Sequence, residues 1–158
     1  MSEEALEERK ILEIGCGIAL PSIIIKKLGG DITASDLHPL ANLFLKKNLV
    51  LNSIGPIPFD SRNWNTKEEN LKKYDLMIAS DVLYEKRHIN LLVSFIRRHS
   101  HRNTKVILVD PGRGSHRAFG RAMKHIGFDH TWSDLSEFSL GAKEKGFIFR
   151  FSQKRYLK

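Results

Sequence analysis

The chain has 158 residues, and 41% of them are hydrophobic, which is typical of a globular protein that buries a core, so a disordered chain is not the expectation. Its 26 lysines and arginines against 18 aspartates and glutamates give a net charge of +8, which favours acidic partners without identifying one. The basic residues are scattered over several expected helices, so a solvated surface is favoured over a nucleic-acid site, which stays open. No apolar run reaches the roughly 20 residues of a membrane-spanning helix.

The first half of the chain alternates short apolar segments with amphipathic ones. After an acidic, helical lead-in over Met1 to Arg9, which matches neither a secretory signal nor a transit peptide, the segments alternate as strand and helix. We expect a strand at 11–14, a helix to residue 28, a strand at 32–35, a helix at 39–52, a strand at 57–59 and a polar helical turn at 67–72.

The second half continues this rhythm and then departs from it. Tyr74 to Ser80 contains a continuous apolar run, which is typical of a strand buried on both faces. Helical spacing predicts a helix around residues 89–96 and another around 118–126, capped by Gly127, with a strand at 106–109 between them. Thr131 to Phe138 and Gly146 to Phe151 are expected to be two strands that pair antiparallel.

This order of elements predicts an α/β fold. We expect one domain over residues 1–158, a Rossmann-like three-layer sandwich whose sheet is mostly parallel and ends in a C-terminal antiparallel pair. Ligands of such folds bind at the carboxyl ends of the strands. Functional residues are therefore expected after positions 14, 35, 59, 80 and 109.

A glycine-rich turn, Gly15-Cys16-Gly17, directly follows the first expected strand. Glycine allows a tight bend and lets a ligand approach the backbone closely. The segment Ile18 to Leu20 lacks the third glycine of a dinucleotide-binding GxGxxG turn, which weakens a phosphate-binding interpretation. Cys16 is the only cysteine, which excludes an internal disulfide, is typical of a reducing compartment and favours a cytoplasmic protein. We interpret it as a small turn residue.

Asp36 ends the second strand, 21 residues after Gly15. A carboxylate at this position can accept hydrogen bonds from both hydroxyls of a ribose. The alternative is that Asp36 caps the helix that begins near Pro39.

Together, Glu13-Ile14-Gly15-Cys16-Gly17 and Asp36 resemble the first two motifs of class I, seven-strand methyltransferases that depend on S-adenosylmethionine. Three later segments resemble the protein-lysine methyltransferases of methyltransferase family 16, over about Lys10 to Gly127. These segments are Ile18 to Pro21 after the glycines, Asn63-Trp64 after the third strand and Asp81-Val82-Leu83-Tyr84 after the fourth. Asp110-Pro111-Gly112-Arg113 is similar to members that modify electron-transfer flavoprotein.

For the cofactor, S-adenosylmethionine, the resemblance implies a site near the glycine turn. Glu13 would organise the turn, while Gly15, Cys16 and Gly17 would contact the cofactor with their backbone. The other implied contacts are Asp36, Leu37, the adenine-binding pair Asn63 and Trp64, and Ser80 at the methionine part. A turn amide and a core tryptophan are the alternative roles of Asn63 and Trp64.

For the reaction, the resemblance implies that Asp81 and Tyr84 orient a lysine amine beside the transferable methyl group. Their alternative roles are a helix cap and a packing tyrosine. A lysine of a protein is the expected acceptor, and a small molecule stays open. Two rival functions also remain, a nicotinamide-dependent oxidoreductase and a non-catalytic binding module.

Two departures from the family pattern bear on binding. Ala19 stands where many members have a third glycine, and only ten residues precede Ile11, where members usually carry a longer cover over the cofactor. We therefore expect a truncated or short relative with a more open site and weaker cofactor binding. The seven histidines show no paired spacing with an acidic partner, so no metal site is expected.

Overall fold

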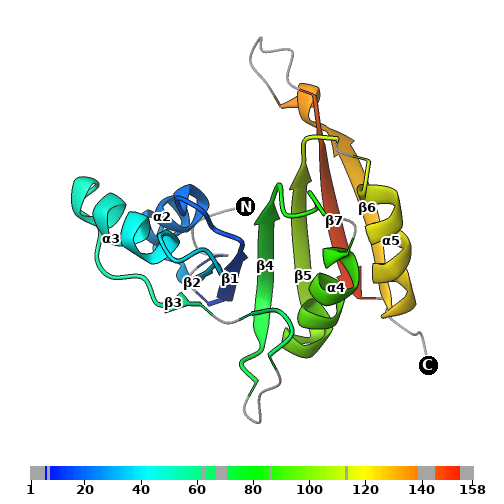
Figure 1. Ribbon diagram of the computed structural model, residues 1–158, viewed down its shortest axis with the longest axis horizontal. Coiled ribbons are helices and arrows are strands. Elements are labelled where there is room, and N and C mark those ends of the chain that lie inside the picture. The colour runs from blue at the N-terminus through cyan, green and yellow to red at the C-terminus, as the bar shows by residue number, and fades with distance from the viewer. Residues whose placement is uncertain are drawn as a thin grey trace.

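A computed structural model describes residues 6, 8–61, 63–66, 71–85, 87–112, 114–138 and 145–153. Its strands form one sheet in the order β3-β2-β1-β4-β5-β7-β6 (Figure 1). The strands are β1 (Lys10–Ile14), β2 (Asp31–Ser35), β3 (Phe59–Asp60), β4 (Tyr74–Ser80), β5 (Ser100–Asp110), β6 (Phe128–Asp134) and β7 (Phe147–Gln153). Within the described residues, no helix is long and apolar enough to span a membrane.

Helices cover both faces of this sheet. They are α2 (Leu20–Lys27), α3 (Ala41–Leu51), α4 (His88–His99) and α5 (His116–His125). The apolar side chains of α2 and α3 share one buried cluster with Ile11 and Leu76, whereas those of α4 and α5 share the other with Leu12 and Met77. Because successive side chains of a strand point to opposite faces, β1 and β4 each contribute to both cores. The three-layer α/β arrangement is confirmed.

The sheet is parallel from β3 to β5 and antiparallel at its other edge. β1 pairs in parallel with β2 and β4, and β5 extends this part of the sheet. β7 pairs antiparallel with both β5 and β6, which confirms the expected C-terminal pair. The buried β4 strand also matches the expectation, since Leu76 and Met77 are at most 1% exposed.

Several expected boundaries were wrong, for local reasons. The third strand is Phe59–Asp60 instead of 57–59, because Pro58 has no N–H to donate and contributes only its carbonyl, to the amide of Ala34 at 2.9 Å. The helix expected from Pro39 begins at Ala41. β5 is longer than expected and spans Ser100–Asp110.

The last two strands also differ from the expectation. β6 ends at Asp134 instead of Phe138, because the Asp134 carboxylate accepts a hydrogen bond from the amide of Ser136 at 2.9 Å and caps a 3-10 turn over Leu135–Glu137. The helical turn expected at 67–72 lies largely outside the described residues, and residues 71–73 belong to no helix or strand. Most of the lead-in expected over residues 1–9 is also outside them.

Candidate functional site

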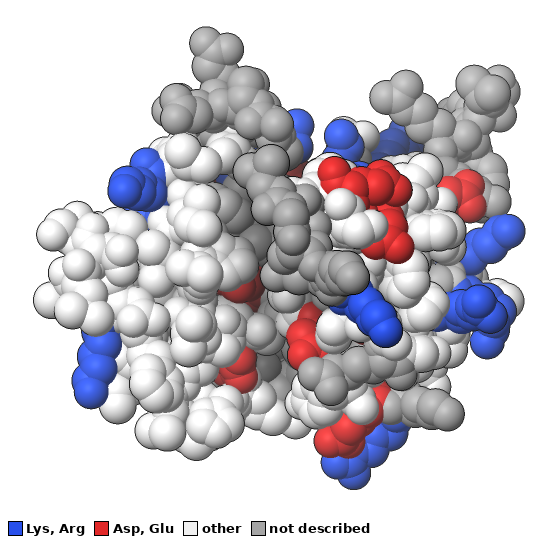
Figure 2. Space-filling view, turned by 90° about the horizontal axis from the view of Figure 1, so that it is seen from above, with Lys and Arg blue, Asp and Glu red and all other residues white. Residues whose placement is uncertain are grey.

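The carboxyl edge of the parallel strands carries one acidic side chain for each strand. Asp60 and Asp110 end β3 and β5, Asp36 and Asp81 directly follow β2 and β4, and Glu13 is the penultimate residue of β1. β4 and β5 point upward in Figure 1, so Figure 2 looks onto this edge and shows acidic side chains along a hollow. In a chain of net charge +8, this edge is a local region of negative charge that attracts cationic ligands.

The glycine turn sits at the centre of the edge. Gly15 and Gly17 have φ angles of +66° and +53°, in the left-handed region that favours glycine. A Cβ on Gly15 would lie 2.7 Å from Cγ1 of Val82, so this glycine is needed for close packing against the segment after β4. A Cβ on Gly17 would meet nothing within 4 Å, so its backbone faces open space.

Glu13 anchors the glycine turn through hydrogen bonds from Ser22 in the following helix. Its carboxylate is buried and accepts hydrogen bonds from the Ser22 hydroxyl and from the Ser22 amide, the latter at 3.0 Å. Burial raises the pKa of the Glu13 carboxyl, and the hydrogen bonds from Ser22 oppose this shift. Glu13 therefore ties β1 to the first turn of α2, as expected for a residue that organises the turn.

Asp36 connects the glycine turn to the end of β2. One carboxylate oxygen accepts a hydrogen bond from the amide of Gly17 at 2.8 Å, and the other accepts one from the amide of His38 at 2.7 Å. The helix that follows, α3, has Leu40 at its N-cap and no side-chain cap, so the capping alternative for Asp36 is wrong. Leu37, beside it, is 62% exposed.

Cys16 is held inside the turn by its backbone. Its amide donates to the Ser35 carbonyl at 2.9 Å, and its side chain is buried. Burial, with Glu13 and Asp36 nearby, raises the pKa of the thiol to about 12. The thiol therefore stays protonated at neutral pH, which agrees with a turn residue and disfavours a nucleophile.

The segment Asp81 to Tyr84 lies against the glycine turn. The amide of Asp81 donates to the Val109 carbonyl at 2.9 Å, and Asp81 has a φ of +54°. Val82 and Leu83 are buried, and Val82 reaches Gly15. Ser80 is exposed at the end of β4. The structure thus brings the segment at Asp81 beside the turn at Gly15, two segments that the family resemblance assigned to one site.

Of the alternative roles of Asp81 and Tyr84, the helix cap does not match the structure. α4 begins at His88 with Arg87 at its N-cap and no side-chain cap, so Asp81 does not cap it. Tyr84 is 60% exposed, so it lies outside the core. Its ring packs edge to face against His88, with 5.7 Å between ring centroids, which agrees with a packing tyrosine.

Trp64, in the segment between β3 and β4, contacts the same histidine as Tyr84. Its ring lies edge to face with His88 at 5.9 Å between centroids, and it packs half-buried against the larger core cluster. His88 therefore links Trp64 to Tyr84, a role that sequence reasoning missed because no motif or spacing marks this histidine. Asn63 is exposed and accepts a hydrogen bond from the amide of Asn65 at 3.1 Å, which agrees with a turn amide.

These residues fit a nucleoside that carries positive charge better than a dinucleotide. The backbone at Gly17 is open, and the Asp36 carboxylate beside it can accept further hydrogen bonds. A pyrophosphate would need the first-turn amides of α2, but Ser22 already donates its amide to Glu13. Within the described residues, no cluster of three histidine, cysteine or acidic side chains is arranged to hold a metal ion. Arg113 lies outside those residues.

Comparison with solved structures shows to which known fold this sheet and its helices correspond. The chain superposes on a TehB-like S-adenosylmethionine-dependent methyltransferase from Corynebacterium glutamicum with a TM-score of 0.76 and 16% identity, covering 96% of this chain and 83% of that one. It matches the glycopeptide N-methyltransferase MtfA, complexed with sinefungin, with a TM-score of 0.75 and 12% identity, covering 93% and 87%. Sinefungin is an analogue of S-adenosylmethionine. The fold is that of class I S-adenosylmethionine-dependent methyltransferases.

The family follows from the sequence itself. Residues 1–124 match the lysine methyltransferase family, to which this chain belongs. The electron transfer flavoprotein beta subunit lysine methyltransferase of Danio rerio is 29% identical over 107 residues, covering 66% of this chain and 41% of that protein. The chain thus spans less than half the length of this relative.

Proposed function

We propose that this chain binds S-adenosylmethionine at its acidic edge and supports methyl transfer to a lysine of a protein. The close approach of Val82 to Gly15 carries this proposal, because it supports a position beside the glycine turn for the segment that begins at Asp81. Family membership supports lysine as the acceptor. The chain covers 41% of the electron transfer flavoprotein beta subunit lysine methyltransferase of Danio rerio, so we propose the methyl transfer and the lysine acceptor for this chain on its own residues.

In the proposed complex, the cofactor lies against the surface that the glycine turn and Asp36 form together. Asp36 accepts hydrogen bonds from the ribose, Gly17 lets the ligand approach the backbone, and exposed Leu37 supplies apolar contact. Trp64, joined to Tyr84 through His88, borders the adenine side. The negative charge of the edge favours the positive sulfonium of the cofactor.

The bound cofactor supplies an electrophilic methyl group on sulfur. The residues of this chain prepare the nucleophile, because a lysine ammonium, with a usual pKa of about 10.4, must release a proton to solvent before its nitrogen attacks. The Asp81 carboxylate accepts a hydrogen bond from the amine and orients its lone pair, and the Tyr84 hydroxyl provides a second polar contact. The chain forms no covalent intermediate in this scheme.

The rival functions receive less support. A nicotinamide-dependent oxidoreductase needs helix amides for a pyrophosphate, and here the amide of Ser22 is already bound by a carboxylate. A binding module without activity needs no carboxylate beside the glycine turn, whereas Asp36 and Asp81 both lie there. A small-molecule acceptor differs from the proposal only in substrate, and the family favours lysine.

The test is transfer of a labelled methyl group from S-adenosylmethionine into protein lysines of a cell extract, compared among variants. We expect Asp81→Ala to lower transfer at least tenfold while S-adenosylhomocysteine still binds. Asp31→Ala is the matched control, since this exposed aspartate begins β2 at the opposite edge. Undiminished transfer in Asp81→Ala would contradict the role of Asp81, and label found only in small molecules would contradict the proposed acceptor.

A further inference from the structure

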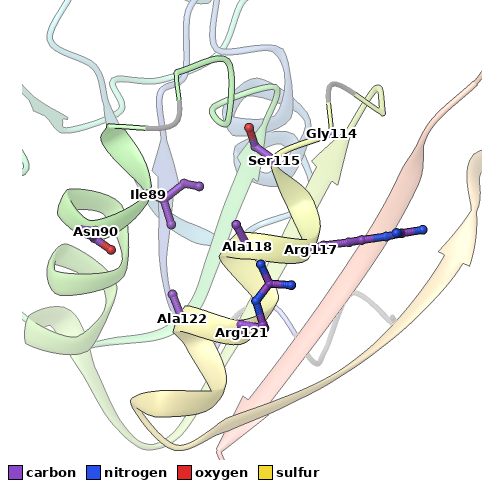
Figure 3. A pocket seen from close by; sticks show the side chains of 8 residues that line it. All are labelled: Ile89, Asn90, Gly114, Ser115, Arg117, Ala118, Arg121 and Ala122. Carbon is purple, nitrogen blue, oxygen red and sulfur yellow. The ribbon is translucent and has the colours of Figure 1, made fainter.

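A groove lies beside the acidic edge, between the first turns of α4 and α5. Its volume is about 560 Å³, and Figure 3 shows the side chains that line it. Ile89 contributes from α4, and Ala118 and Ala122 contribute from α5, so the floor is apolar. Because both helices start near the carboxyl ends of β4 and β5, the groove lies near the same edge of the sheet as Asp81.

Two arginines give the groove positive charge. Arg117 and Arg121 both line it and are exposed, and α4 and α5 contain no acidic residue. In Figure 3 the Arg121 side chain rises beside the groove, while the Arg117 side chain points to the other side of α5, away from Ile89. Within the described part of the chain, no ion pair involves either arginine. Both guanidinium groups are therefore available to an acidic partner.

The start of α5 adds a second feature that favours negative charge. Ser115, at the N-cap of α5, lines the groove and is only 5% exposed, yet its hydroxyl makes no capping hydrogen bond. The first turn of α5 also lacks an acidic residue. The amides of this turn thus receive no capping acceptor from Ser115, and the carboxylate of buried Asp110 lies 3.9 Å from the ring of His116.

We propose that this groove binds an acidic segment of the protein substrate, next to the lysine that is methylated. The inference rests on the proposed function, which places the methyl acceptor at the same edge. Arg117 and Arg121 are four residues apart on a helix, about 6 Å along its axis. Alternate residues of an extended peptide are about 6.6 Å apart, so two acidic residues separated by one residue match the two arginines. Apolar side chains of the segment would cover Ile89 and Ala122.

The direct test is binding of two fluorescein-labelled peptides that carry one lysine each. One contains Asp-Ala-Asp and the other contains Asn-Ala-Asn in its place. We expect the acidic peptide to bind the full chain about tenfold more tightly in fluorescence anisotropy, as two solvent-exposed charge pairs allow. The preference should disappear in the double variant Arg117→Gln and Arg121→Gln.

A charge-matched control separates the groove from net charge. Arg97 and Arg102 are exposed at and beyond the far end of α4, so the double variant Arg97→Gln and Arg102→Gln should keep the preference. The proposal would be overturned if both peptides bind equally well to the native chain. It would also be overturned if both double variants lose the preference for the acidic peptide to the same extent. Tighter binding of a single-stranded oligonucleotide that depends on Arg117 and Arg121 would also overturn it, in favour of nucleic acid.

A second measurement on the same preparations keeps this inference distinct from the proposed function. Calorimetry with S-adenosylhomocysteine reports the cofactor site alone. If S-adenosylhomocysteine binds but the Asp-Ala-Asp peptide is not preferred, the proposed role of the groove is wrong and the proposed methyl transfer is unaffected. A peptide preference without cofactor binding would instead overturn the proposed function.

Discussion

The Asp36 carboxylate accepts a hydrogen bond from the Gly17 amide at 2.8 Å, across 19 residues of sequence. This bond joins the end of β2 to the glycine turn that follows β1. Its second oxygen holds the amide of His38 at 2.7 Å, so the carboxylate is fixed in position before a ligand arrives. Preorganisation of this kind lowers the cost of binding, because less freedom is lost in the complex.

Replacing Asp36 therefore tests the proposed cofactor site at Gly17 and Asp36. We expect Asp36→Ala to weaken S-adenosylhomocysteine binding by about 1.5–3 kcal/mol, the usual loss for hydrogen bonds to a charged group. Calorimetry measures this change, with Asp31→Ala, at the other end of the same strand, as the control. Unchanged affinity in Asp36→Ala would place the ligand elsewhere.

Gly15 and Gly17 predict different outcomes for the same substitution. Both have positive φ angles, so alanine at either costs about 1 kcal/mol in backbone strain. At Gly15 the added Cβ also collides with Val82 at 2.7 Å, which adds about 1–3 kcal/mol, whereas at Gly17 it meets open space. Urea unfolding should show Gly15→Ala as the less stable variant.

A second substitution checks the cause of that difference. Val82→Ala removes the atom that an alanine at position 15 would strike. The double variant should therefore be more stable than the sum of the two single effects predicts, by about 1 kcal/mol. Strict additivity would show that the collision has no part in the loss.

Buried Glu13 predicts a pH dependence of stability. Burial raises the pKa of its carboxyl above the ordinary value of 4.5, so the folded state holds this proton to a higher pH than the unfolded state does. The resulting stabilisation is complete below about 4.5 and is lost as the pH rises through the raised pKa. Relative to Glu13→Gln, which cannot ionise, the native chain should lose stability as the pH rises above 4.5. A constant difference in urea midpoints over this range would contradict the assignment.

Cys16 predicts low chemical reactivity. Its thiol has a pKa of about 12 and is buried, against an ordinary value of 9.0. Alkylation by iodoacetamide at pH 8 should therefore be about a hundredfold slower, or more, in the native chain than in urea, because the thiolate is the reacting form. Equal rates in the two conditions would show that the turn is open.

The three-layer fold, the mostly parallel sheet and the sheet edge that carries the candidate site could be predicted from the sequence, because each depends on local patterns. The apolar run in Tyr74 to Ser80 and the glycines after Ile14 are examples, since strand burial and turn geometry follow directly from residue type. The ends of elements were less predictable. β6 stops where Asp134 caps a short turn, and β3 is displaced by Pro58, two effects of single side chains on backbone hydrogen bonds.

Contacts between distant segments could not be predicted from patterns at all. The collision that makes Gly15 necessary involves Val82, and the aromatic group around His88 joins Trp64 and Tyr84 through tertiary packing. The groove at Arg117 and Arg121 likewise exists only because α4 and α5 pack side by side. Spacing within one helix marks neighbours on that helix, and it carries no information about the facing helix.

The central claim is that the edge at Gly17 and Asp36 is built for S-adenosylmethionine. Isothermal titration calorimetry of the chain with S-adenosylhomocysteine, and separately with NADH, tests it most directly. We predict saturable binding of S-adenosylhomocysteine at one site and no saturable heat with NADH. Saturable NADH binding, or the absence of S-adenosylhomocysteine binding by a folded chain, would contradict the claim.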